Sequence, residues 1–151
     1  MKLTELLSAV LLVAAIPTNV SAHCQVPCGI FDDDNVIGSM NTDFLTIEKA
    51  CVEIAALSKD PAANAHQIVR WTTNKETHAQ DLQEKVLNHF MAQRLKLPEN
   101  DEQNEAYIAK LRLCHEVIVA AMKCKQSTDM ANVTKLHDLL HSFAKEFGTK
   151  K

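Results

Sequence analysis

The sequence is poor in the residues that build turns and strand faces. It has three glycines and four prolines in 151 residues, and aromatic side chains make up only 5% of it. Sheet proteins depend on such residues for tight turns and strand packing, whereas a chain that is 46% hydrophobic without them is typical of packed helices. The sequence therefore predicts an all-α fold, and its length gives room for one domain.

An excess of positive charge is also lacking. Sixteen Lys and Arg residues face nineteen Asp and Glu residues, which gives a formal net charge of −3. Proteins that bind nucleic acid carry a stripe of Lys and Arg that neutralises phosphates, and no such stripe is present. Nucleic acid is therefore not an expected partner, and an anionic substrate would have to be attracted locally.

The one pronounced apolar run is too short to span a membrane comfortably. It extends from Leu6 to Ile16, whereas a spanning helix needs about 20 apolar residues. Lys2 precedes the run, Pro17 ends it, and small residues lead up to Ala22. These are the parts of a secretory signal peptide over residues 1–22, which predicts a secreted or lumenal protein with no membrane segment after cleavage. An uncleaved anchor or an organelle-directing leader is the alternative.

The cysteine count is odd, so a complete set of intramolecular disulfides is excluded. Cys51 and Cys114 fall on the apolar stripes of expected helices, where a free cysteine packs as a small hydrophobic residue. Cys124 falls near a helix end, where we expect it to be exposed. Cys24 and Cys28 directly follow the leader, and in an oxidising compartment they could simply pair with each other.

The segment after the leader also offers a set of metal ligands. Cleavage after Ala22 makes His23 the first residue, so a free amine, an imidazole and the thiols of Cys24 and Cys28 lie within six residues. Nitrogen and thiolate donors favour copper, nickel or zinc, and a planar arrangement of them favours nickel or copper. Zinc is the weaker candidate because no second Cys or His pair follows at zinc-finger spacing.

Four amphipathic helices are expected in residues 32–151. Apolar residues recur at steps of three and four, and the breaks contain capping residues or proline. Short connections between such helices are typical of an antiparallel up-down four-helix bundle. The expected helices run from the Asp32–Asn35 segment to about Leu57, over 62–97, from about Asn100 to Cys124, and over 130–147.

A metal site inside the bundle is not expected. A di-iron bundle needs Glu-x-x-His motifs, and Glu99, Glu102 and Glu105 have no histidine three residues further on. Six histidines are scattered over the expected helices. Among them His137 and His141 are four residues apart, a spacing that places two rings on one helix face.

The order His-Cys-x-x-Pro-Cys-Gly over residues 23–29, followed by Ile30 and Phe31, resembles the nickel hook of nickel-dependent superoxide dismutase. Lys75-Glu76-Thr77-His78 and the proline-containing break before the third helix extend the resemblance. It implies conversion of superoxide to dioxygen and hydrogen peroxide by Ni(II)/Ni(III) cycling, with one nickel ion per subunit of a homohexamer.

The resemblance also implies residue roles. The amine and imidazole of His23, the amide nitrogen and thiolate of Cys24 and the thiolate of Cys28 are the implied ligands of a hook over residues 23–31. The backbone N–H groups of Gln25 and Cys28 are expected to face the substrate. The alternative functions are a non-enzymatic secreted bundle with a Cys24–Cys28 disulfide and a copper or nickel carrier.

Two positions depart from the family pattern. Phe31 stands where many members have a tyrosine, so the ring is kept and its hydroxyl is lost. Members often steady the N-terminal imidazole with a glutamate and an arginine, where this chain offers Ser39 and His78. Because a second partner normally fixes the orientation of a metal-binding imidazole, we expect His78, or else Asp32 or Asp33, to take this role.

Overall fold

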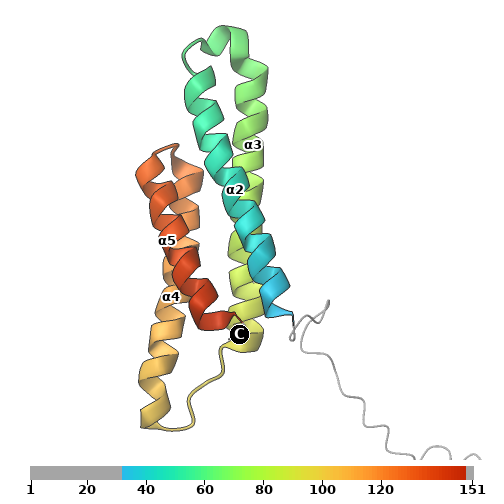
Figure 1. Cartoon of the computed structure of the whole chain (residues 1–151). Coiled ribbons are helices and arrows are strands. Elements are labelled where there is room, and N and C mark those ends of the chain that lie inside the picture. The colour runs from blue at the N-terminus through green and yellow to red at the C-terminus, as the bar shows by residue number, and fades with distance from the viewer. Residues whose placement is uncertain (1–31, 149–151) are drawn as a thin grey trace, which may run out of the picture.

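The computed structural model describes residues 32–148, which form helices with short connections. The elements are α2 (Asp33–Leu57), α3 (Pro61–Lys85), the π-helix η1 (Val86–Arg94), α4 (Asp101–Gln126) and α5 (Met130–Phe147). Since η1 continues α3, residues 32–148 build four helical rods and no strand (Figure 1). The all-α prediction and the four helix ranges are confirmed, whereas the leader (1–22) and the hook (23–31) lie outside the described residues.

Three of the helices begin at the capping side chains that the sequence provides. The Asp60 carboxylate accepts a hydrogen bond from the backbone N–H of Ala63, with Pro61 at the first helical position. Asn100 accepts from Gln103 N–H at the start of α4, and Asp129 accepts from Ala131 N–H at the start of α5. Each cap satisfies one of the N–H groups that a helix start leaves without an intrahelical partner, which fixes where these helices begin.

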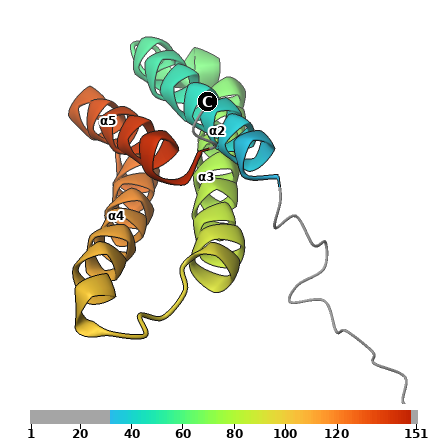
Figure 2. The same cartoon turned by 60° about the horizontal axis from the view of Figure 1, so that its bottom comes forward.

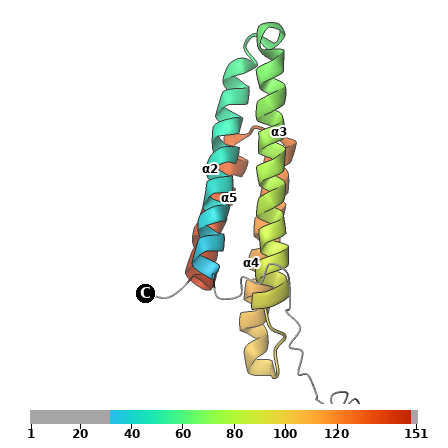
Figure 3. The ribbon, with the colours of Figure 1, turned by 90° about the vertical axis from the view of Figure 1, so that its right-hand side faces the viewer.

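The helices pack as a bundle around one apolar core. The long pair α2 and α3 makes the most extensive contacts, while α5 contacts α2 and α4, and α4 contacts α3 (Figures 1 and 3). The far ends of α2 and α3 extend beyond α4 and α5, and the side chains of Ile68 and Trp71 there are only partly buried. The predicted apolar stripe on α3 therefore becomes core only from Lys75 onward.

The core combines small residues with aromatic rings. Ala50, Ala79 and Ala121 are fully buried, and alanine at a helix contact lets two helices approach closely. Phe90 packs edge-on against Phe143 with 4.7 Å between ring centroids. The same core contains Met40, Phe44, Ile47, Cys51, Leu82, Val86, Cys114, Val117, Ala120, Cys124, Val133, Leu136 and Leu139.

The π-helix changes which residues α3 presents to the core. The backbone N–H of Leu95 bonds to the carbonyl of Phe90 at 2.8 Å, five residues back, which is the π pattern. His89 and Phe90 are consecutive, and both are buried. Consecutive residues of an α-helix point about 100° apart, so the wider π turn helps to bring both rings inside.

At the other end of the chain, Gly148 ends α5 beside the first turn of α2 (Figure 2). A Cβ at this position would stand 2.5 Å from the carbonyl oxygen of Ala144 and 3.5 Å from Oδ1 of Asp34. Only glycine therefore fits without a shift of the backbone. Within residues 32–148, no helix is both long enough and apolar enough to cross a membrane.

Candidate functional site

The start of α2 is the part of the structure nearest in sequence to the predicted metal ligands. His23, Cys24, Gln25, Cys28 and Phe31 lie outside the described residues, and α2 begins two residues after Phe31. The structure therefore describes the helical support that follows this segment in the sequence. Three features of that support bear on the site: the anchor of α2, the surroundings of His78, and the state of the remaining cysteines.

Asp33 anchors the first turn of α2 to the π-helix. Its Oδ1 lies 2.8 Å from Nε2 of His89, and its Oδ2 lies 2.7 Å from the guanidinium of Arg94. Asp33 and His89 are both buried. A buried carboxylate is stable only when its charge is paired and its oxygens are hydrogen-bonded, and both conditions are met here. Asp33 is thus committed to this contact, which argues against it as the partner of the His23 imidazole.

His78 is held by a buried carboxylate on α2. Its Nδ1 lies 2.9 Å from Oδ1 of Asp43, while Oδ2 of Asp43 accepts from the ammonium group of Lys85 at 2.5 Å. The Asp43 side chain is 6% exposed and the His78 side chain 33%. Because Nδ1 is occupied, the other ring nitrogen, Nε2, is available to a further partner. Ser39, one turn before Asp43, is exposed.

Asp81 lies next to the same pair. One nitrogen of His78 and one carboxylate oxygen each of Asp43 and Asp81 lie within 4.8 Å of one another. Among residues 32–148 this is the one group of three or more His, Cys, Asp or Glu side chains with that spacing. The Glu-x-x-His motif considered in the sequence does not find Asp43 and Asp81. Asp81 follows His78 by three residues instead of preceding it, and Asp43 comes from another helix.

The other cysteines belong to the core. Cys51, Cys114 and Cys124 are free and fully buried, which confirms the prediction for Cys51 and Cys114. The prediction that Cys124 is exposed is wrong: Cys124 is part of the shared core, and Lys75 of α3 donates to its carbonyl oxygen. Burial raises the pKa of the Cys114 and Cys124 thiols to about 11 and raises that of Cys51 as well. Neutral, enclosed thiols are poor metal ligands.

His137 and His141 do share a face of α5, with 6.2 Å between ring centroids. Both are exposed, and they line a hollow of about 280 Å³ between α5 and α2. They do not form part of a three-ligand group within residues 32–148. The ring of His137 packs instead against Phe44, with 5.2 Å between centroids.

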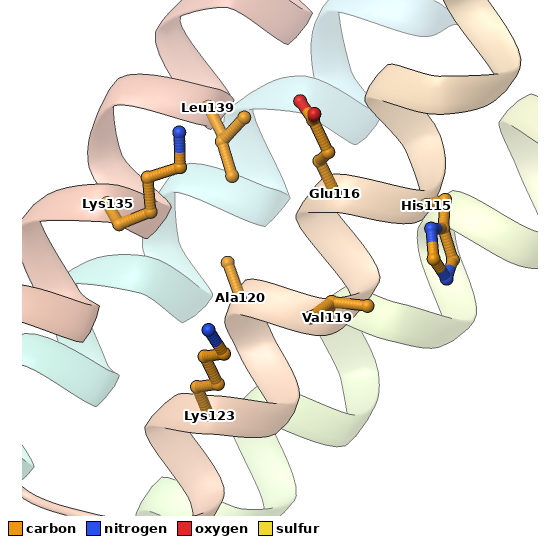
Figure 4. Close-up of a pocket in the computed structure, with 7 residues that line it drawn as sticks. All are labelled: His115, Glu116, Val119, Ala120, Lys123, Lys135 and Leu139. Atoms are coloured by element: carbon orange, nitrogen blue, oxygen red, sulfur yellow. The ribbon is translucent and has the colours of Figure 1, made fainter.

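A second hollow, of about 230 Å³, lies between α4 and α5 (Figure 4). Ala120, Val119 and Leu139 form its apolar part, and the ammonium groups of Lys123 and Lys135 extend beside it. It contains no thiol, and His115 and Glu116 at its edge do not meet a third potential ligand. This hollow therefore does not resemble a metal centre.

Residues 32–148 thus form a helical bundle with three thiols in its core, and the sequence places an imidazole and two further thiols, the donors that transition metals favour, before α2. The sequence profile of the family described as nickel-containing superoxide dismutase matches residues 18–151. The chain belongs to this family: it is an oxidoreductase that uses nickel and acts on superoxide. Comparison with curated proteins and with solved structures gave no match.

Family membership favours the enzyme over the two alternatives drawn from the sequence. Nothing in the structure or the comparisons supports a non-enzymatic bundle or a metal carrier. The side chains of His23, Cys24 and Cys28 fit the metal, since imidazole and thiolate groups suit nickel, whereas magnesium and calcium prefer oxygen.

Proposed function

We propose that this superoxide dismutase binds one nickel ion per subunit in the hook formed by residues 23–31, after removal of residues 1–22. The ligands are the amine and imidazole of His23, the amide nitrogen and thiolate of Cys24, and the thiolate of Cys28. The supporting observation is the location of the other three thiols. Of five cysteines, three are buried in the helical core, so Cys24 and Cys28 are the two left to supply soft donors.

These ligands suit the reaction. Bound nickel supplies a one-electron redox centre that alternates between Ni(II) and Ni(III). Two thiolates and a deprotonated amide donate electron density and bring the potential into the range needed to both oxidise and reduce superoxide. The backbone N–H groups of Gln25 and Cys28 are proposed to hold the anion. Overall, two superoxide ions and two protons give one dioxygen and one hydrogen peroxide.

Phe31 changes how the protons reach this site. A phenylalanine ring excludes water and packs against neighbours as a tyrosine ring does, but it has no hydroxyl to donate. We therefore propose that the protons come from solvent or from another side chain, with Phe31 restricted to shielding the substrate position.

We further propose that His78 steadies the imidazole of His23. The side chain is one-third exposed and its Nδ1 is fixed by Asp43, which leaves Nε2 for a second imidazole. Asp43 is ten residues along α2 from Asp33, a rise of about 15 Å. His23 precedes Asp33 by ten residues, which reach at most about 35 Å when extended. The distance can therefore be bridged.

The remaining proposals concern assembly and compartment. We propose the up-down order for the bundle, supported by the short turn between α2 and α3 and by the extensive contacts within that pair. A homohexamer is proposed on family membership alone. Secretion or delivery to a lumen is proposed from the leader, and only residues 18–22 of that leader fall within the matched region.

The experiment compares two forms of the chain, one beginning at His23 and one that retains Ser21 and Ala22. Nickel per chain and the rate of superoxide decay are measured on both. The form beginning at His23 should bind one equivalent of nickel and be active, while the extended form loses both properties. Full activity in the extended form would disprove the proposed ligand set.

Matched cysteine variants separate ligation from folding. Cys24→Ser and Cys28→Ser should each remove nickel and activity while the helical content, measured by circular dichroism, stays unchanged. Cys124→Ala removes a thiol that is not a proposed ligand, so it should keep its nickel and show only lower thermal stability.

A further inference from the structure

Asp43, His78 and Asp81 form a compact group of potential ligands on the bundle itself, apart from the hook. Asp43 comes from α2, and the other two come from α3. His78 and Asp81 are three residues apart in an unbroken α-helix, so their side chains lie on the same face. Contacts between α2 and α3 bring Asp43 onto that face, where it reaches Nδ1 of His78.

The spacing is that of ligands around one ion. Zinc bonds to imidazole nitrogen and carboxylate oxygen at about 2.0–2.2 Å, so two ligands of a tetrahedral ion lie about 3.4 Å apart. Nδ1 of His78 and Oδ1 of Asp43 are 2.9 Å apart, and a carboxylate oxygen of Asp81 lies within 4.8 Å of a ring nitrogen of His78 and of a carboxylate oxygen of Asp43. A three-ligand set therefore requires the Asp81 side chain to turn toward the other two ligands.

The charges favour a cation at this point. Two carboxylates contribute two negative charges, and the ammonium group of Lys85 on the second oxygen of Asp43 offsets one of them. Within residues 32–148, the half-buried Asp81 carboxylate has no hydrogen bond or ion pair with another side chain. The pair formed by Asp33 and His89 differs, because Arg94 neutralises it and no third ligand is present.

We propose that Asp43, His78 and Asp81 form a second metal site, which binds a divalent first-row transition ion such as Zn²⁺. One neutral nitrogen with two carboxylate oxygens suits zinc, while calcium and magnesium prefer sites made of oxygen alone. Three protein ligands leave the fourth tetrahedral position to water. The site uses Nδ1 of His78 and none of the hook residues, so it does not depend on the proposed nickel ligands.

The test uses the full chain with His23→Ala, Cys24→Ser and Cys28→Ser, so that the hook cannot bind the probe. Zn²⁺ is titrated by calorimetry, and metal per chain is measured after gel filtration. We expect one equivalent of Zn²⁺. Adding Asp81→Asn should weaken binding by at least about tenfold through the loss of one ligand, and His78→Gln should do the same.

Two neighbouring substitutions serve as controls. Glu84→Gln removes one negative charge about one turn along α3 from Asp81. Because Glu84 is exposed and accepts a hydrogen bond from Gln80, the Zn²⁺ affinity should change by less than about threefold. Lys85→Gln removes the competing ammonium group and should tighten binding. Absence of Zn²⁺ binding, or equal binding by the parent and the Asp81→Asn chain, would overturn the site. Circular dichroism on each variant establishes that the helices are intact.

Discussion

The ammonium group of Lys75 lies 2.6 Å from the carbonyl oxygen of Cys124, although 49 residues separate them in the sequence. It also donates to the carbonyl oxygens of Lys125 and Ser127. These carbonyls are at the C-terminal end of α4, where the helix dipole is negative and carbonyl groups lack helical partners. A lysine that is only 3% exposed therefore closes the end of α4 from within α3.

Lys75→Met should lower the free energy of unfolding by about 2–3 kcal/mol, because several buried carbonyl groups lose a charged donor. Urea unfolding would show this as a lower midpoint with an unchanged m-value. Lys110→Met is the matched control, since Lys110 makes a surface pair with Glu146 and a contact with the ring of Phe147 and bonds to no buried carbonyl group. Its effect should be under about 1 kcal/mol. Equal effects of the two substitutions would contradict the capping role.

Asp33→Ala should cost about 2–4 kcal/mol of stability, because it leaves the buried His89 ring and the Arg94 guanidinium without their carboxylate. Amide hydrogen exchange in the first turn of α2 should become much faster. Asp32→Ala is the comparison: Asp32 is exposed and makes no side-chain cap, so slow exchange should persist in that variant.

The contribution of Cys114 to stability should fall as the pH rises from about 9 to about 11. The thiol has an ordinary pKa of 9.0 and a folded-state pKa of about 11, because burial penalises the thiolate. In that interval the unfolded chain loses the proton and the folded chain keeps it. Stability then drops by up to about 1.4 kcal/mol per pH unit.

Comparing the wild type with Cys114→Ala isolates this thiol, because all other titrating groups are shared. The stability advantage of the wild type should be constant below pH 9 and shrink above it. A thiol reagent at pH 8 should also leave Cys51, Cys114 and Cys124 unmodified until the protein unfolds. Rapid labelling of any of them in the native protein would show that the core is open.

His78→Gln tests the proposed contact with the hook. Nickel content should stay near one equivalent, whereas the axial nitrogen signal in the electron paramagnetic resonance spectrum of the oxidised protein should change. Activity should fall by about tenfold, since partners of ligating histidines typically contribute that much. His66 is exposed near the start of α3, so His66→Gln should leave the axial nitrogen signal and the activity unchanged. An identical axial signal in His78→Gln would remove His78 from the site.

The helix boundaries could be predicted because the signals are local. Asp60, Asn100 and Asp129 cap helices in the structure, and the proline after Asp60 occupies the first helical position. Each of these caps bonds to a backbone N–H two or three positions away, so the sequence alone contains the information. The family could likewise be predicted, because its motif occupies nine consecutive residues.

What could not be predicted depends on contacts between helices. Cys124, near the end of α4, is buried in the core that the helices share, and Lys75 of α3 donates to its carbonyl oxygen. The π-helix also has no local signature here, and the meeting of Asp43 with His78 requires α2 and α3 to be in register. Spacing along one helix says nothing about such distances.

The position of Gly148 against Asp34 affects how the protein can be handled. An affinity tag at the C-terminus would follow a residue that lies against the first turn of α2, the helix that the proposed hook precedes in the sequence. A tag attached directly before His23 would block the amine that is proposed to bind nickel. The turn at Ser58–Asp60, at the opposite end of the long helix pair, is therefore the place to insert a label or an immobilisation sequence.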